Sequence, residues 1–193
     1  AVQEAYDVVN DFAKVAKLAR KGLKVLGEVS LEPGKPMKVM LYQKAKDMNE
    51  AFETVGTPAI IEFKYDGFRL VISKKKNKIM LFTRRLENVT EQFPDVVEAV
   101  EKYVEGDEFI LDSETVGFDV KTKKYLPFQS ISQRIRRKYD IKEISEKFPV
   151  EINVFDMAFF EGKSLLKTPF EERRKIIEKI IKNKPFVIKI AEQ

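Results

Sequence analysis

The sequence is 193 residues long, 44% hydrophobic and 35% charged, and its 36 basic and 31 acidic residues give a net charge of +5. It contains neither cysteine nor histidine, which excludes disulfides, thiolate metal sites, a cysteine nucleophile and every serine–histidine triad. No apolar run approaches the roughly 18 to 20 residues that a membrane span needs. The composition therefore predicts a soluble, cytoplasmic protein, and its richness in Lys and Glu is also typical of thermophiles.

The first part of the chain has a helical pattern. Apolar residues recur at helical spacing over residues 2–20 and predict one amphipathic helix, and a second short helix is predicted over residues 47–55. Between them, prolines and a glycine in residues 32–36 interrupt the pattern. We place a domain boundary here, with residues 1–35 as one unit and residues 36–193 as the other.

The stretch from Pro58 to Lys64 is predicted to be a strand, because an apolar run over residues 58–61 leads into alternation that puts Ile61 and Phe63 on one face and the charged residues 62 and 64 on the other. Asp66 and Gly67 then predict a turn, and the β-rich runs over residues 69–73 and 79–83 predict a hairpin. A lysine at the end of such a strand can protect a sheet edge against aggregation. It can equally belong to a functional site.

The remaining elements mix helices and strands without a regular order. We expect a helix with Thr90 as its N-cap and Pro94 in its first turn. A second helix, to about residue 181, is expected to open with a capping box over Thr168–Glu171 and to have Pro169 at its first position. A further helix is predicted over residues 128–139, and strands over 108–116, 149–160 and 185–190. Since no βαβ alternation occurs, the pattern favours an α+β fold with largely antiparallel sheets flanked by helices.

Polar residues at the predicted strand ends suggest a chemistry. Lys64, Arg69, Arg84 and Glu114 all lie at such ends, where functional sites are commonly built. Neighbouring cations favour the neutral, nucleophilic form of a lysine and also hold phosphate oxygens, while a carboxylate can bind a divalent metal or a ribose hydroxyl. The set points to phosphoryl or nucleotidyl transfer, although neither a P-loop nor a G-x-G-x-x-G motif occurs.

The six residues from Lys64 to Arg69 match K-x-D-G-x-R, the nucleophile motif of covalent nucleotidyltransferases. The chain most resembles the ATP-dependent DNA ligases of archaeal and eukaryotic type. Four further segments resemble motifs of that family in the same order: Thr83–Thr90, Phe109–Glu114, Phe128–Gln129 with the Arg-rich helix after it, and Val154–Asp156 with Glu161–Gly162. By this resemblance, residues 1–35 are the end of a helical DNA-binding domain and residues 36–193 are an adenylation domain.

The resemblance implies that Lys64 attacks the α-phosphorus of ATP and forms a lysyl-AMP intermediate. AMP then passes to the 5′-phosphate of nicked duplex DNA, and the 3′-hydroxyl displaces it. Arg69 and Arg84 would contact phosphate and ribose oxygens, and Glu114 would bind the ribose or Mg²⁺. A sliding clamp is a further partner that the family implies, through regions outside this chain.

The resemblance also assigns the adenine edge to Glu62 and a stacking contact with the adenine ring to Phe155. For each residue a simpler interpretation stays open, since Glu62 can be a surface strand residue and Phe155 has the apolar neighbours of a core residue. Asp156 is better explained as a structural hydrogen-bonding carboxylate than as a ligand.

A basic helix offers candidate contacts to DNA. Its cations are Arg134, Arg136, Arg137 and Lys138. Phosphate contacts of this kind suit a nick-binding surface, while the simpler interpretation is a solvated helix face.

The chain also departs from the family pattern. It lacks the E-G-[LVM]-[MV]-x-K motif and the lysine-containing motif that follow in the family, so we expect it to be a partial adenylation domain. Two alternatives share part of the pattern. One is an RNA ligase or a capping-type nucleotidyltransferase, and the other is a nucleic-acid-binding module without catalysis.

Overall fold

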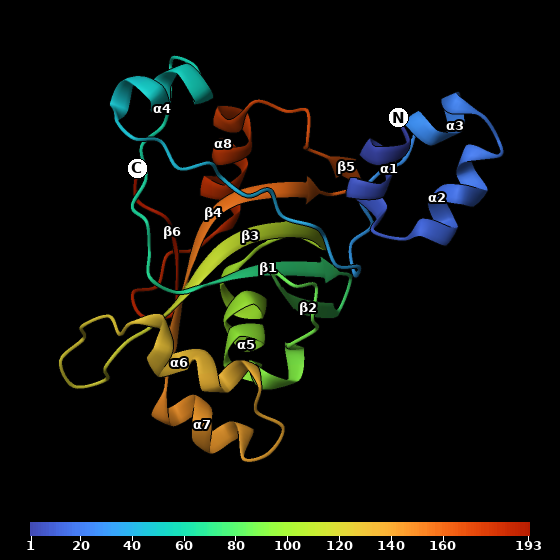
Figure 1. The fold of residues 1–193 in the computed structure, drawn as a ribbon. Helices are drawn as coiled ribbons and strands as arrows, with labels where there is room; N and C mark the ends of the chain where they lie inside the picture. Colours follow the sequence, from blue (N-terminus) through green and yellow to red (C-terminus); the bar gives the residue numbers. More distant parts are fainter.

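The computed structural model describes residues 1–193. At its centre is a six-stranded sheet with the order β2-β1-β3-β4-β5, to which β6 adds by pairing with β4 (Figure 1). The strands are β1 (Phe68–Lys75), β2 (Lys78–Thr83), β3 (Glu108–Gly117), β4 (Val150–Phe160), β5 (Lys163–Ser164) and β6 (Ile188–Ile190). All pairs are antiparallel except β4 with β6. The predicted α+β fold with a largely antiparallel sheet is confirmed.

Helices surround this sheet. They are α1 (Val2–Val9), α2 (Phe12–Ala19), α3 (Leu23–Gly27), α4 (Met48–Val55), α5 (Pro94–Tyr103), α6 (Phe128–Ile135), α7 (Ile141–Lys147) and α8 (Phe170–Ile180), with a 3₁₀ turn, η1 (Thr90–Gln92). None of them is long and apolar enough to cross a membrane.

The two faces of the sheet differ because side chains alternate along each strand. One face, the helix-covered face, carries Leu70, Ile72 and Leu111, which belong to a buried cluster with residues of α5, α6 and α8. The opposite face, here called the charged face, carries Val71 and Ile110 in a smaller cluster with the chain segment that follows α3. Toward one end of the strands, this second face becomes charged.

The N-terminal helix is interrupted, so the prediction of one helix over residues 2–20 is wrong. Asn10 takes a left-handed conformation with φ 52° and ends α1, and the Asp11 side chain then caps α2 by accepting a hydrogen bond from the Lys14 N–H (2.9 Å). Asn and Asp tolerate the left-handed region and cap helices well. The first three helices share a small core of their own around Ala5, Val15 and Leu26.

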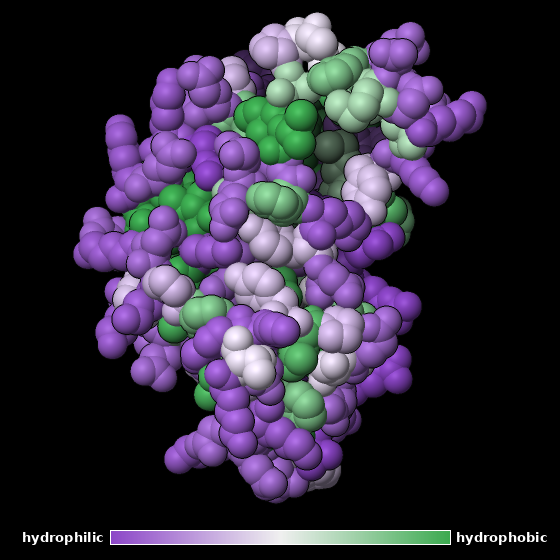
Figure 2. Space-filling model, turned by 90° about the vertical axis from the view of Figure 1, so that its left-hand side faces the viewer, coloured by the Kyte–Doolittle hydropathy of each residue, from purple (hydrophilic) through white to green (hydrophobic).

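The segment before β1 is not a strand, although its alternating sequence predicts one. Residues 58–65 form no regular secondary structure, and Ile61 and Phe63 are 68% and 69% exposed. A strand needs a neighbour to receive its backbone hydrogen bonds, and no strand of this chain pairs with these residues. Figure 2 views the molecule from the left-hand side of Figure 1, and hydrophobic residues there interrupt a largely hydrophilic surface.

Most other elements occur where the sequence predicts them, including the β1–β2 hairpin, β3, β4, α4 and α8. Several ends differ. Helix α6 stops at Ile135, four residues early, and β6 starts only at Ile188. Thr90 begins η1 and accepts a hydrogen bond from the Leu81 N–H (3.0 Å), so it does not cap α5. At α8, Pro169 is the N-cap and no side chain caps the helix.

Strand β4 contains irregularities that affect one predicted site residue. The Cα partners of Asp112 and Ser113 are Asp156 and Val154, so Phe155 between them has no partner on β3. The extra residue is a β-bulge, which changes the direction of side chains locally.

Candidate active site

The predicted nucleophile lies just outside the sheet. Lys64 is exposed on the unpaired segment that leads into β1, and Arg69 is the second residue of β1. Arg69 is directly opposite Glu114 of β3 in the ladder, so their side chains leave the sheet on the same face. Lys64 and Arg69 both act electrostatically on the Glu114 carboxylate. The structure thus brings these three residues together at the end of the charged face.

Gly67, which lies between Lys64 and Arg69 in the sequence, packs closely against the backbone of β3. A Cβ atom at this position would approach the Thr115 carbonyl oxygen of β3 to 2.3 Å. Pairing of Phe68 with Thr115 begins at the next residue. Only a glycine lets the two backbones come this close. The close approach fixes where the segment of the predicted nucleophile, residues 58–65 and here called the nucleophile segment, joins the sheet.

Arg69 is already engaged by protein groups. Its Nε and Nη2 donate to the two carboxylate oxygens of Asp112 (2.9 and 2.5 Å), and its Nη1 donates to the Met40 carbonyl oxygen (2.9 Å). The guanidinium carbon lies 5.3 Å from the centroid of the Phe155 ring. A bidentate pair of this kind fixes the orientation of the guanidinium. Arg69 is therefore a rigid part of the site, and Phe155 is its neighbour.

Asp112 is the residue that the sequence interpretation missed. It is 6% exposed, and burial raises its pKa above the ordinary value although Arg69 opposes the shift. The sequence does contain a signal, because Asp112 and Glu114 are two residues apart on one strand and must share a face.

Glu114 has a strongly shifted pKa. Burial raises it from the ordinary 4.5 to about 7, against the opposing effects of Lys64, Arg69 and the Gly67 N–H, while Asp112 adds to the rise. A carboxylate that titrates near neutrality among cations is a frequent feature of functional sites.

The other predicted nucleotide ligands lie at the edge of this group. Glu62 is on the same segment as Lys64, and its carboxylate accepts a hydrogen bond from the Gln193 side-chain amide (2.8 Å). Arg84 is exposed and follows Thr83, whose Cα partner is Leu70, so it lies at the same end of the sheet as Arg69. Asp156 accepts two hydrogen bonds from Arg173 (2.7 and 2.9 Å), as expected of a structural carboxylate.

The basic helix does not present all of its cations to solvent. Arg134 is fully buried, with its guanidinium 4.4 Å from the Phe93 ring centroid and donating to both carboxylate oxygens of Asp95 (3.0 and 2.6 Å). It is therefore unavailable to DNA phosphates, and that prediction is corrected. Arg136, Arg137 and Lys138 are exposed, although Arg137 also pairs with Asp140 (3.2 Å).

The predicted Mg²⁺ would need carboxylates of this site as ligands. No group of three or more of them converges to hold a metal ion. Mg²⁺ commonly keeps several waters and is held by one or two carboxylates together with substrate phosphates. Glu114, which is not engaged in an ion pair at hydrogen-bonding distance, fits that mode.

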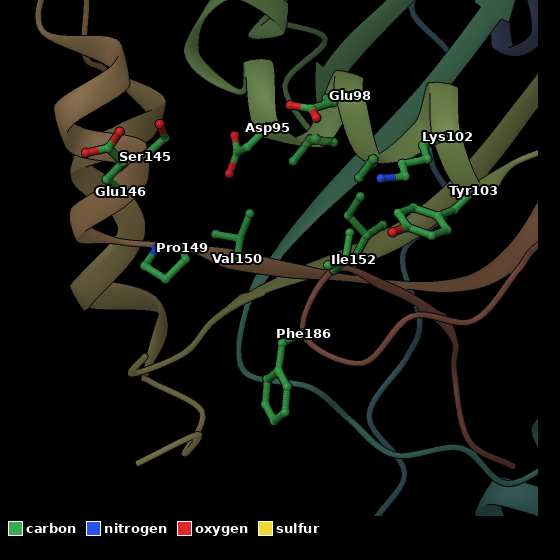
Figure 3. Close-up of a pocket in the computed structure, with 13 residues that line it drawn as sticks. Asp95, Glu98, Lys102, Tyr103, Ser145, Glu146, Pro149, Val150, Ile152 and Phe186 are labelled. Carbon is green, nitrogen blue, oxygen red and sulfur yellow. The ribbon is translucent and has the colours of Figure 1, made fainter. Parts of the chain in front are cut away.

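A cavity lies away from this group of residues. It has a volume of about 350 Å³ and opens between α5, α7 and the start of β4, with Phe186 beside it (Figure 3). Its charged lining residues are Asp95, Glu98, Glu146 and Lys102. Three carboxylates against one ammonium do not suit a polyphosphate, and no predicted site residue lines this cavity.

Comparison with known proteins places the chain in a family. The family model described as "ATP dependent DNA ligase domain" matches residues 39–193. The DNA ligase of Nanoarchaeum equitans is 49% identical over 192 residues, which is 99% of this chain and 34% of that protein. The DNA ligase of Methanopyrus kandleri is 42% identical over 193 residues, which is 100% of this chain and 34% of that protein. The chain thus spans about a third of the length of these relatives.

A solved structure is also similar to the chain. It is described as "mycobacterial DNA ligase D complexed with ATP and MES", is 27% identical, covers 61% of this chain and 35% of its own, and superimposes with a TM-score of 0.44. The family match covers most of the chain and includes Lys64, Arg69, Glu114 and Phe155. The chain belongs to the ATP-dependent DNA ligase domain family.

Proposed function

We propose that Lys64 is the nucleophile of the adenylation reaction of a DNA ligase. Its Nζ attacks the α-phosphorus of ATP, an N–P bond forms, the bond from that phosphorus to the pyrophosphate oxygen breaks, and Nζ loses its proton. The observation that carries the proposal is the grouping of an exposed Lys64 with Glu114 and Arg69 at one end of the charged face, in a chain that matches the ligase family.

The neighbouring residues would bind the nucleotide. Arg69, held by Asp112, and Arg84 would contact phosphate and ribose oxygens, as fixed and exposed cations respectively. Phe155, beside the Arg69 guanidinium, would stack on the adenine ring, and Glu62 would accept a hydrogen bond from the adenine edge.

Glu114 would bind the ribose or Mg²⁺. When bound, Mg²⁺ would neutralise charge on the phosphate oxygens and polarise the reacting phosphorus. With a pKa of about 7, Glu114 is partly ionised at neutral pH, and a nearby cation would favour its charged form.

The later steps are proposed for the whole ligase of which this adenylation part would be one component. AMP passes from Lys64 to the 5′-phosphate at a nick in duplex DNA, and the 3′-hydroxyl then attacks that phosphate and releases AMP. Arg136, Arg137 and Lys138 would contact backbone phosphates. Roles in replication, repair and recombination, contact with a sliding clamp, and the division into units 1–35 and 36–193 belong to the same proposal.

The direct test is covalent labelling. The chain is incubated with ATP labelled at the α-phosphate and with Mg²⁺, denatured, and analysed by gel and mass spectrometry. We expect one AMP on Lys64, its loss in Lys64→Ala, and retention in Lys78→Ala, an exposed lysine of the β1–β2 hairpin. Labelling that persists in Lys64→Ala, or no labelling of the wild-type chain, would contradict the proposal.

The DNA contacts are tested by salt dependence. Removing one cation that contacts a phosphate should weaken binding to nicked duplex and reduce the slope of log affinity against log salt by about 0.9. We expect this for Arg136→Ala and Lys138→Ala. An unchanged slope would remove these residues, which follow α6, from the proposed interface.

A further inference from the structure

The nucleophile segment has no strand partner, so its position depends on side-chain contacts with other parts of the chain. Its side-chain hydrogen bonds involve the chain after β6. The Glu192 N–H donates to the Tyr65 hydroxyl oxygen (3.4 Å), and the Gln193 side-chain amide donates to Glu62 (2.8 Å). Figure 1 shows this C-terminal segment running beside the segment that precedes β1. The residue next to Lys64 is therefore in contact with the β6 region.

Lys189 of β6 is the central residue of this contact. Its Nζ lies 5.8 Å from the centroid of the Tyr65 ring and 5.7 Å from that of Tyr125. Both distances are within the range in which an ammonium group is attracted to an aromatic face. The Lys189 side chain is only 22% exposed, so this attraction is partly shielded from water.

Carboxylates fix the position of Lys189. Its Nζ lies 3.1 Å from Glu192 and 3.7 Å from Glu151, a residue of β4 that is 2% exposed. Burial alone lowers the pKa of Lys189, but Tyr125, Glu192 and Glu151 together raise it above the ordinary value. The ammonium is therefore charged at neutral pH.

Glu151 is itself anchored to the folded core. Its two carboxylate oxygens accept hydrogen bonds from the Tyr125 hydroxyl and from the Phe186 N–H, both at 2.5 Å. A continuous set of contacts thus runs from a buried strand residue through the Lys189 ammonium to the Tyr65 ring.

We propose that Lys189 is a positioning residue, which holds the ring of Tyr65 and thereby orients Lys64 toward its substrate. The inference rests on the proposed role of Lys64. It assigns Lys189 no contact with the nucleotide. The requirement is for a positive charge on β6, so arginine should replace lysine while an isosteric neutral side chain should not.

The first experiment needs no nucleotide and uses the full 193-residue chain. Backbone order parameters of Lys64, Tyr65 and Asp66 are measured by ¹⁵N relaxation in the wild type, Lys189→Met, Lys189→Arg and, as a matched control, Lys184→Met, an exposed lysine just before β6. We expect values to fall from about 0.85 to below about 0.6 in Lys189→Met only. Unchanged values in Lys189→Met, or an equal fall in Lys189→Arg, would overturn the proposal.

The second experiment separates positioning from ATP binding. The rate of lysyl-AMP formation is measured in single turnovers against ATP concentration. For Lys189→Met we expect the maximal rate to fall about tenfold with less than a twofold change in half-saturating ATP, and Lys189→Arg to restore most of the rate. A rise in half-saturating ATP at an unchanged maximal rate would instead make Lys189 a ligand for ATP and overturn the proposal. Failure of Lys64 labelling in the wild type would refute the proposed function, whereas the relaxation measurements would still decide the role of Lys189.

Discussion

The two faces of the sheet are built on the same strands but from opposite kinds of interaction. On β3, Leu111 is fully buried among apolar side chains on the helix-covered face, while its neighbour Asp112 pairs with Arg69 on the charged face. Burial of apolar surface supplies stability without direction, whereas charge-assisted hydrogen bonds fix orientation and add little net stability. Folding therefore depends mainly on the helix-covered face, while the residues proposed to act in catalysis lie on the charged face.

The largest effect is expected from Leu111→Ala, which tests this division on the helix-covered face. Removing a fully buried leucine should lower the free energy of unfolding by about 3 to 4 kcal/mol, because a cavity remains. Denaturant unfolding measures the change. AMP labelling of the remaining folded protein should be unaffected, and a loss of labelling in folded protein would show that the two faces are coupled.

The second test concerns the buried arginine of α6. Arg134→Ala should cost about 3 kcal/mol of unfolding free energy, because it leaves Asp95 without its partner and removes a guanidinium packed on Phe93. Arg136→Ala, two residues away and exposed, should change stability by less than about 0.5 kcal/mol. Equal losses in the two variants would mean that burial does not distinguish these arginines.

The third test is at the junction between the nucleophile segment and the sheet. Gly67→Ala places a Cβ against the Thr115 carbonyl, which requires a backbone shift and should cost about 1 to 3 kcal/mol. Because that shift moves Lys64, we expect AMP labelling to slow more than the loss of folded protein explains. Labelling at the wild-type rate would show that the backbone position of Gly67 does not control the position of Lys64.

The smallest effect is expected at Glu114 and depends on pH. Its folded pKa of about 7 exceeds the ordinary 4.5, so the folded state binds more protons than the unfolded state between these values. Stability should therefore fall as pH rises from 4.5 to about 7, by about 1 to 2 kcal/mol after allowance for solvent screening. Glu114→Gln should reduce this slope and leave the part that comes from Asp112, whose pKa burial also raises. An identical slope in the variant would assign it to other groups.

Much of this arrangement could be predicted from sequence, and the failures have physical causes. Alternation along β3 and the hairpin pattern are local signals, and they predicted that Arg69 and Glu114 lie at strand ends, whereas the pairing of β1 with β3 that puts the two residues opposite each other is not a local signal. The strand expected before Lys64 failed because strand formation depends on a neighbour that local alternation does not specify. Sequence alone likewise did not reveal that Asp112 is the partner of Arg69.

Arg134 shows a signal that was present but assigned to the wrong environment. It follows Ile131 by three residues, so both lie on the same side of α6, and both are fully buried. A cation on the apolar stripe of an amphipathic helix predicts an internal ion pair, whereas cations off the stripe predict solvent exposure. This distinction separates Arg134 from Arg136.

The bulge in β4 has a consequence for how this domain tolerates changes in length. Since Phe155 has no partner on β3, while Val154 and Asp156 pair with successive β3 residues, a deletion of Phe155 would leave both flanking pairs in register. The aromatic ring beside Arg69 therefore occupies a position that the hydrogen-bonded ladder does not require. The fold should tolerate a one-residue deletion here. The same deletion at a paired residue would move every later side chain of the strand to the opposite face of the sheet.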